Sequence, residues 1–212
     1  MKRLFLSAQV HHVAKQIAAK IDNLSSLHGV FITTAFEDKD HNLDWHYRNK
    51  QGLVDAGFVF DLYTISGKSE QEIIKDLNSY DFIYVEGGNA FYLMQESQKN
   101  NFADYIRKRV NDGMIYIGTS AGSVAAGPDI DPVARPERTS MARDLASTEG
   151  FGLVDFSIIP HWADEGRRQM AFSVRLPHIY QDKWKLILLT NSQYVEVKDD
   201  YYRICDNRDI KA

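Results

Sequence analysis

Short, continuous runs of apolar residues recur along this chain, and segments of helical periodicity separate them. The runs lie within predicted strands at residues 3–7, 29–33, 58–63, 81–85, 114–117 and 156–159. A strand that is apolar along its whole length is buried on both faces, and the intervening helices supply that cover. The alternation therefore predicts an α/β fold, with a doubly wound, mostly parallel sheet sandwiched between helices.

Further segments complete this arrangement within one domain. The predicted helices lie at residues 13–24, 44–56, 69–77, 90–111 and 167–175. Further strands are predicted at residues 186–189, 194–197 and 201–205, the last two with the spacing of a hairpin. The 212 residues, 44% of them hydrophobic, are enough to bury one core, so we expect a single domain over residues 1–212.

Residues 127–150 interrupt the alternation. They contain Pro128, Pro132 and Pro136 and show little apolar periodicity. A long irregular segment within a compact domain is usually functional or mobile. We expect these residues to form a structureless loop that closes over a site.

Charge and cysteine content exclude several classes of protein. The formal net charge is −4 with both signs interspersed, so no basic face for nucleic acid is expected. The single cysteine, Cys205, excludes an internal disulfide and a thiolate zinc site. No pair of histidines has convincing metal spacing, so we expect neither a metal nor a cofactor.

Hydrophobicity points to a cytoplasmic protein. The N-terminal apolar run at residues 4–6 is too short for a signal peptide, and no stretch approaches the length that spans a bilayer. We therefore expect no association with a membrane. The sequence does not decide the oligomeric state, and a homodimer stays open.

A glycine-rich turn provides the strongest functional signal. Residues 118–122 read Gly-Thr-Ser-Ala-Gly, directly after a predicted strand and before a helix-compatible segment. This is the G-x-S-x-G nucleophile elbow, in which small neighbours let the chain fold back so that the hydroxyl of Ser120 projects into a cleft. The amide of Ala121 then points the same way and can stabilise an oxyanion. An ordinary glycine turn is the alternative, and the flanking strand and helix favour the nucleophile.

Two other predicted strands end in residues that suit this chemistry. Gly87 and Gly88 follow the strand at residues 81–85, and the Gly88 amide could be a second oxyanion donor, although an ordinary turn capped by Asn89 is the simpler interpretation. His161 follows the strand at residues 156–159, where a base for the serine belongs. A solvent-facing loop histidine is the alternative there.

Three segments in series resemble the peptidase E family, the aspartyl dipeptidases and their relatives, including cyanophycinases. They are residues 87–91 (Gly-Gly-Asn-Ala-Phe), residues 118–123 (Gly-Thr-Ser-Ala-Gly-Ser) and residues 160–161 (Pro-His). Their order and approximate spacing agree with the family, and the likeness extends over most of the chain. The resemblance implies an α/β sandwich related to class I glutamine amidotransferases and metal-independent peptide hydrolysis.

The same resemblance assigns the central catalytic roles. It implies that Ser120 is the nucleophile, that His161 is the base, and that the amides of Gly88 and Ala121 form the oxyanion hole.

The residue that orients the base departs from the family pattern. Aspartyl dipeptidases place an acidic residue between the serine and the histidine, but ungapped counting from the elbow reaches Arg135 here. Some relatives use a glutamate on a mobile loop. We therefore predict Glu137 as the acid, with Asp131 second and Asp129 as a further alternative.

The residue expected to bind the substrate's carboxylate also departs from the family pattern. The family holds the substrate's aspartyl carboxylate with an arginine beyond the histidine, and Arg167, Arg168 and Arg175 all fall in that region. A guanidinium suits a carboxylate, although these residues could equally be charges on a solvated helix face. We assign substrate binding to Arg168 and Asn89.

The predicted function is a serine peptidase that hydrolyses short peptides through an acyl-enzyme, in the manner of a dipeptidase, with Asp-X peptides as candidate substrates. Two alternatives remain. One is another serine hydrolase, such as an esterase, which shares the order serine, acid, histidine. The other is a ligand-binding member of the fold that has lost catalysis.

Overall fold

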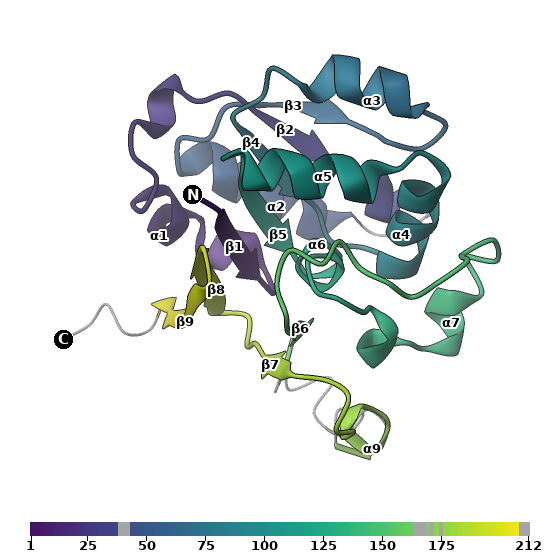
Figure 1. Cartoon of the computed structure of the whole chain (residues 1–212). Coiled ribbons are helices and arrows are strands. Elements are labelled where there is room, and N and C mark those ends of the chain that lie inside the picture. The colour runs from purple at the N-terminus through teal and green to yellow at the C-terminus, as the bar shows by residue number, and fades with distance from the viewer. Residues whose placement is uncertain (38–42, 163–168, 170–171, 174–175, 208–212) are drawn as a thin grey trace.

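The computed structural model describes residues 1–37, 43–162, 169, 172–173 and 176–207, without the side chains of Pro136 and Glu137. A seven-stranded sheet forms its centre, in the order β3-β2-β4-β5-β1-β8-β9 (Figure 1). The strands are β1 (Arg3–Ser7), β2 (Gly29–Ile32), β3 (Phe60–Tyr63), β4 (Phe82–Val85), β5 (Ile115–Thr119), β8 (Gln193–Lys198) and β9 (Tyr201–Asp206).

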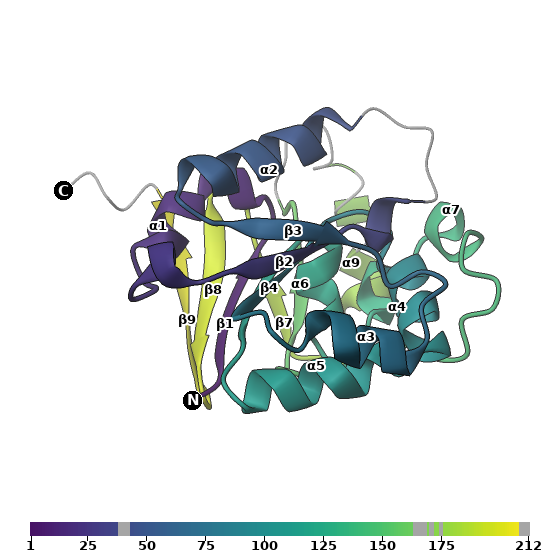
Figure 2. The same ribbon diagram turned by 90° about the horizontal axis from the view of Figure 1, so that it is seen from above.

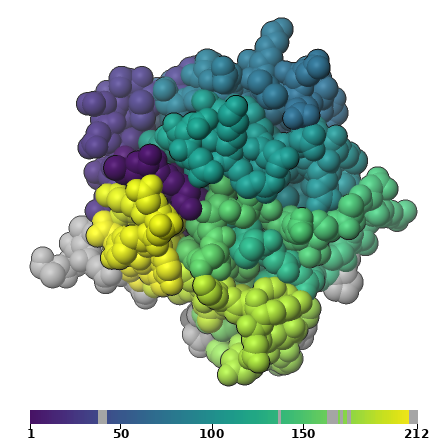
Figure 3. Space-filling view, in the orientation of Figure 1, coloured from purple at the N-terminus to yellow at the C-terminus, as the bar shows by residue number. Residues whose placement is uncertain are grey.

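The strand directions agree with the sequence pattern. Every pair from β3 across to β1 is parallel. The predicted hairpin β8–β9 joins the sheet antiparallel to β1, so the C-terminal hairpin lies beside the first strand (Figures 1 and 3). The prediction of a mostly parallel α/β sheet is confirmed.

Helices cover both faces of this sheet (Figure 2). One face carries α1 (Ala14–Ala18) and α2 (Asp44–Asp55), and the other carries α3 (Glu70–Leu77), α4 (Ala90–Lys99), α5 (Phe102–Asn111) and α6 (Ala121–Ala125). Side chains alternate along a strand, so Leu4 and Leu6 enter one buried cluster while Phe5 enters the other. This double burial explains why the inner strands β2 and β4 carry no charged residue, whereas the edge strand β3 contains the exposed Asp61.

The segment predicted as one helix over residues 90–111 is two helices, α4 and α5. The break falls at Asn100 and Asn101, and Asn101 has a φ of 56°, a left-handed conformation that asparagine tolerates better than most residues. The Asn100 side chain donates to the carbonyl of Ile65 at 2.8 Å and accepts from the amide of Phe102 at 3.3 Å. These side-chain bonds replace helical ones, which the apolar periodicity alone could not reveal.

Residues 127–150 are not structureless, contrary to expectation. They contain the short helices η4 (Asp131–Val133) and α7 (Pro136–Thr139). A bridge between Asp129 and Glu149 closes the base of the segment. The segment is tied to α4, because the amides of Asp144 and Ala146 donate to the side-chain oxygens of Gln95 at 2.9 Å and Gln98 at 3.0 Å.

Two strands stand apart from the main sheet. β6 (Ser157–Ile159) and β7 (Leu186–Leu188) pair in parallel as a separate two-stranded sheet. The helix predicted around residues 167–175 falls mostly outside the described residues, and α9 (Leu176–Ile179) follows it. Within the described ranges, no helix is both long and apolar enough to cross a membrane.

Candidate active site

Ser120 occupies a strained turn between β5 and α6. Its φ of 46° and ψ of −106° lie in a region that non-glycine residues seldom adopt, at a cost of about 1–3 kcal/mol. Its amide donates to the carbonyl of Ser7 at 2.9 Å, which fixes the turn against β1. A Cβ on Gly122 would lie 2.1 Å from the carbonyl oxygen of Val85. The elbow therefore needs glycine at that position to pack α6 against β4.

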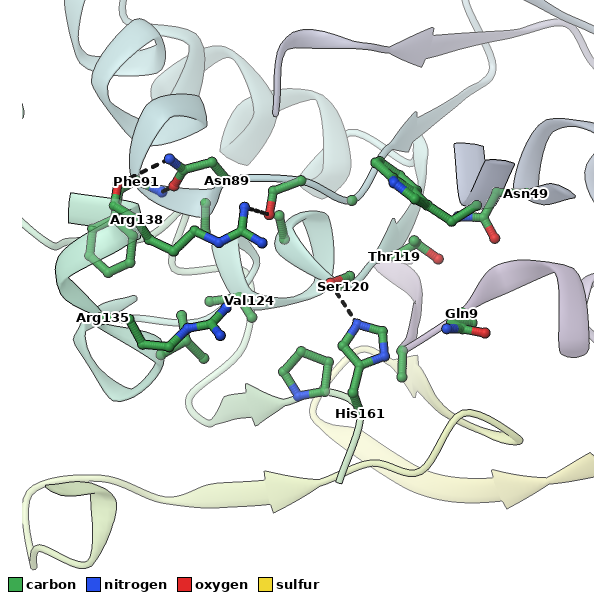
Figure 4. Close-up of a pocket in the computed structure, with 18 of the residues that line it drawn as sticks. Gln9, Asn49, Asn89, Phe91, Thr119, Ser120, Val124, Arg135, Arg138 and His161 are labelled. Atoms are coloured by element: carbon green, nitrogen blue, oxygen red, sulfur yellow. Dashed lines mark hydrogen bonds between the residues drawn. The ribbon is translucent and has the colours of Figure 1, made fainter. Parts of the chain in front are cut away.

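His161 lies directly beside this serine. Its Nε2 is 3.0 Å from the Oγ of Ser120 (Figure 4). The residue follows β6 and Pro160 and has a positive φ of 61°. The turn after β6 thus brings the imidazole to the hydroxyl of Ser120, although β6 is not a strand of the main sheet.

Asn191 contacts the other nitrogen of the imidazole. The Nδ1 of His161 is 2.8 Å from the Oδ1 of Asn191, which follows β7. Because β6 and β7 are parallel with Ile159 opposite Leu188, their carboxyl ends emerge side by side. An Nδ1–H donated to this oxygen leaves a lone pair on Nε2 to accept the serine proton. Asn191 could not be identified from the sequence, because an asparagine after a short strand carries no distinguishing signal.

The acidic candidates lie in different surroundings. Both oxygens of Asp129 accept hydrogen bonds, from the amide of Asp131 at 2.8 Å and from the indole of Trp184 at 3.2 Å. The carboxylate of Asp131 lies 3.8 Å from the Nζ of Lys183. Glu137 is on α7, but its side chain is outside the described part of the chain. Its assignment as the acid stays a prediction.

The two predicted oxyanion donors come from separate elements that meet at Ser120. Ala121 is the first residue of α6, where no preceding helical carbonyl can take its amide. Gly88 follows β4 with a φ of 138°, and a Cβ there would lie 2.1 Å from the carbonyl oxygen of Ala35. Gly87 is close as well, since a Cβ on it would lie 3.2 Å from the Cβ of Ser120. Only glycine fits the conformation at residue 88.

A cavity of about 370 Å³ opens above Ser120 and His161. Gly88 and Ala121 line it, and so do arginines from two elements, Arg48 of α2 and Arg135 and Arg138 of the 127–150 segment. In Figure 4, Arg135 and Arg138 lie on one side of Ser120, with Gln9 and Asn49 on the other. Among the described residues, no group of three or more His, Cys, Asp or Glu side chains could hold a metal ion.

The two residues predicted to bind substrate, Arg168 and Asn89, are not equally described by the structure. Arg168, with Arg167 and Arg175, lies outside the described residues. Asn89 lines the cavity, but its Oδ1 caps α4 by accepting from the amide of Phe91 at 3.0 Å, as expected of an N-cap. Its Nδ2 donates to the carbonyl of Arg138 at 3.0 Å and so ties α7 to the turn. Direct binding of substrate by Asn89 stays a prediction.

Replacing Gly88 by alanine tests the tight fit of this turn. The new methyl group would overlap the carbonyl of Ala35, so the turn must shift and kcat should fall by roughly 10²-fold or more. Gly57→Ala is the matched control, because Gly57 also has a positive φ, of 93°, but nothing lies within 4 Å of a Cβ there. Steady-state kinetics of folded Gly88→Ala at the wild-type level would contradict the assignment.

Comparisons with known proteins agree on a peptidase family. The model of peptidase family S51 matches residues 4–205. An uncharacterised peptidase of Pasteurella multocida is 31% identical over 201 residues, which cover 90% of this chain and 95% of that protein. Peptidase E of a Nostoc species is 31% identical over 182 residues, which cover 78% of this chain and 68% of that protein.

A solved structure extends the agreement to the fold. The 1.5 Å crystal structure of a Listeria monocytogenes protein, provisionally described as a peptidase E, matches with a TM-score of 0.87 and 26% identity. The match covers 97% of this chain and 98% of that one. The predicted fold of the class I glutamine amidotransferase-like type and the resemblance to peptidase E are both confirmed. The chain belongs to peptidase family S51, and it is a peptidase that acts on peptide bonds.

Proposed function

We propose that this protein hydrolyses short peptides through an acyl-enzyme on Ser120, with His161 as general base and Asn191 as the residue that orients it. The distance of 3.0 Å between Ser120 Oγ and His161 Nε2, at a strained elbow inside a cavity, carries the proposal. A hydroxyl is inert without such a base, and this distance is within hydrogen-bond reach.

The reaction proceeds in two halves. His161 takes the hydroxyl proton as Ser120 attacks the scissile carbonyl, and it then gives that proton to the leaving amine. Water, activated by the same imidazole, hydrolyses the ester and restores the serine. The amides of Gly88 and Ala121 stabilise the oxyanion in both halves, each by about 3 kcal/mol.

The cavity favours a small, acidic substrate. Its volume of about 370 Å³ lies near the lower end of small-molecule sites, which suits a dipeptide better than a long chain. Arg135 and Arg138 both line it, and Arg138 donates to the carbonyl of Gly88 at 3.4 Å, beside the oxyanion turn. We therefore propose Asp-X dipeptides as substrates, with these arginines, alongside the predicted Arg168, receiving the aspartyl carboxylate.

A panel of dipeptides that differ at the first residue tests this function. The substrates are Asp-Leu, Asn-Leu and Leu-Leu, with p-nitrophenyl acetate as the ester for comparison. Asp-Leu and Asn-Leu isolate the effect of charge, because their first residues differ in charge but hardly in size. Asp-Leu should have the highest kcat/KM, at least roughly 10-fold above Asn-Leu. Equal rates for the three dipeptides would contradict the acidic preference. Ester hydrolysis without peptide hydrolysis would favour an esterase instead.

Substitutions at Asn191 test the orienting role. Asn191→Ala leaves the imidazole without its acceptor on Nδ1, so kcat should fall by roughly 10- to 100-fold while KM changes little. Asn191→Asp keeps the acceptor and adds a negative charge that stabilises the imidazolium, so its kcat should equal or exceed the wild-type value. If both variants retain wild-type kcat, another group orients His161.

A further inference from the structure

A carboxylate lies completely buried behind the oxyanion turn. Glu86 follows β4 directly and precedes Gly87, and its side chain has no solvent exposure. It is not among the residues that line the cavity. The proposed mechanism gives Glu86 no role. Burying a carboxylate away from water is costly unless it is paired and hydrogen-bonded, so its partners have to account for its position.

Four groups satisfy this carboxylate. Its Oε1 accepts from the amide of Gly87 at 2.7 Å, from the hydroxyl of Tyr84 at 2.9 Å and from the Nδ2 of Asn49 at 3.0 Å. Its Oε2 lies 3.3 Å from the Nδ1 of His46, whose side chain is only 9% exposed. Burial and the charge of Glu86 hold the pKa of Tyr84 well above its usual value, so that hydroxyl stays a donor.

These contacts join the turn to a helix on one face of the sheet. His46 and Asn49 both belong to α2, while Tyr84 belongs to β4. Asn49 is fixed in turn, because its Oδ1 lies 2.8 Å from the Nδ1 of His11. The Gly87 amide therefore donates to a buried carboxylate that side chains of α2 and β4 hold in place, and not to solvent.

The attached turn is the one that faces the nucleophile. A Cβ on Gly87 would lie 3.2 Å from the Cβ of Ser120, so a small shift of this residue changes its relation to the serine. Gly88, the proposed oxyanion donor, is the next residue. Glycine backbone is freer than that of any other residue, so two consecutive glycines need an external constraint to hold an amide in place.

We propose that Glu86 is a positioning residue, whose buried carboxylate holds the Gly87–Gly88 turn in the geometry that stabilises the oxyanion. The inference rests on the proposed role of Ser120 as nucleophile. Because the oxyanion exists only after attack, a loosened turn weakens transition-state binding rather than substrate binding. Changes at Glu86 should therefore act on kcat and leave KM within about twofold.

Two substitutions at Glu86 should lower kcat to different extents. Glu86→Gln keeps an oxygen acceptor for the Gly87 amide, whereas Glu86→Leu removes every acceptor at similar volume. We expect kcat to fall by roughly 10-fold in Glu86→Gln and by roughly 10²-fold in Glu86→Leu, each measured on the folded full-length protein. Hydrogen exchange of the 86–91 backbone should accelerate in the same order.

Glu196→Gln is the matched control. Glu196 is also a buried carboxylate, only 2% exposed, but it pairs with Arg203 and Lys198 on the β8–β9 hairpin. Its substitution should lower the melting temperature without changing kcat or hydrogen exchange at residues 86–91. A loss of kcat equal to that of Glu86→Gln would show that the effect is general destabilisation, and would overturn the inference.

Tyr84→Phe tests the positioning role of Glu86 if the Glu86 variants do not fold. It removes one of the three donors to Oε1 and should lower kcat a few-fold with KM unchanged. Wild-type kcat in folded Glu86→Gln and in Tyr84→Phe would overturn the positioning role while leaving the proposed function intact. A wild-type protein that neither hydrolyses dipeptides nor reacts with a fluorophosphonate would overturn the proposed function, and the positioning role with it.

Discussion

Ser120→Ala is expected to lower kcat for dipeptide hydrolysis by roughly 10⁴- to 10⁶-fold, because the variant cannot form the acyl-enzyme. The substitution removes one oxygen at a residue whose amide is held by the carbonyl of Ser7, so the fold should survive. Steady-state kinetics with an Asp-X dipeptide, alongside a thermal melt, measures both quantities.

Ser123→Ala provides the comparison for this result. Ser123 lies on α6, the short helix that follows Ser120, but its hydroxyl is fully buried and donates to the carbonyl of Ser7 at 2.7 Å. Its loss should cost about 1 kcal/mol of stability and less than roughly 10-fold in kcat. Substantial hydrolysis by Ser120→Ala would mean that another group performs the attack.

His161→Ala is expected to lower kcat by a similar factor, roughly 10⁴-fold or more, since the variant loses the imidazole whose Nε2 lies 3.0 Å from the Oγ of Ser120. Residues that act as one catalytic unit are not additive. The double variant Ser120→Ala/His161→Ala should therefore be hardly slower than either single variant. The residual rate of all three proteins on the same dipeptide checks this.

His28→Gln is the control for the histidine. His28 is half exposed and lies 3.3 Å from a carboxylate oxygen of Asp61, away from the cavity. It should leave kcat unchanged. If the double variant loses the product of the two single effects, the two residues act independently, and the catalytic pair proposed here is wrong.

The fold could be predicted because its signals are local. The inner parallel strands β2, β4 and β5 are buried along their whole length, and the alternation with helices requires that burial on both faces. Where a few polar side chains redirect the backbone, the apolar pattern no longer predicts the structure. Asn100 and Asn101 divide α4 from α5 by hydrogen bonds that apolar periodicity does not register.

The site was predictable as far as motifs and strand ends reach. The glycine spacing points to Ser120 as the nucleophile. The position of His161 after a short strand suits either a base or a loop histidine, and the resemblance to peptidase E favours the base. Asn191 does not follow, because its partnership with His161 depends on the parallel pairing of β6 and β7. The network of Glu86 was invisible for the same reason, since α2 supplies His46 and Asn49 from some forty residues earlier in the chain. Glu137 and Arg168 stay predictions.

Intact-mass analysis of the wild-type protein treated with a fluorophosphonate, followed by peptide mapping, shows whether Ser120 is the nucleophile. We expect one stoichiometric adduct on Ser120, formed in parallel with loss of dipeptide hydrolysis and strongly slowed in His161→Ala. Continued hydrolysis by a protein that carries no adduct on Ser120 would contradict it.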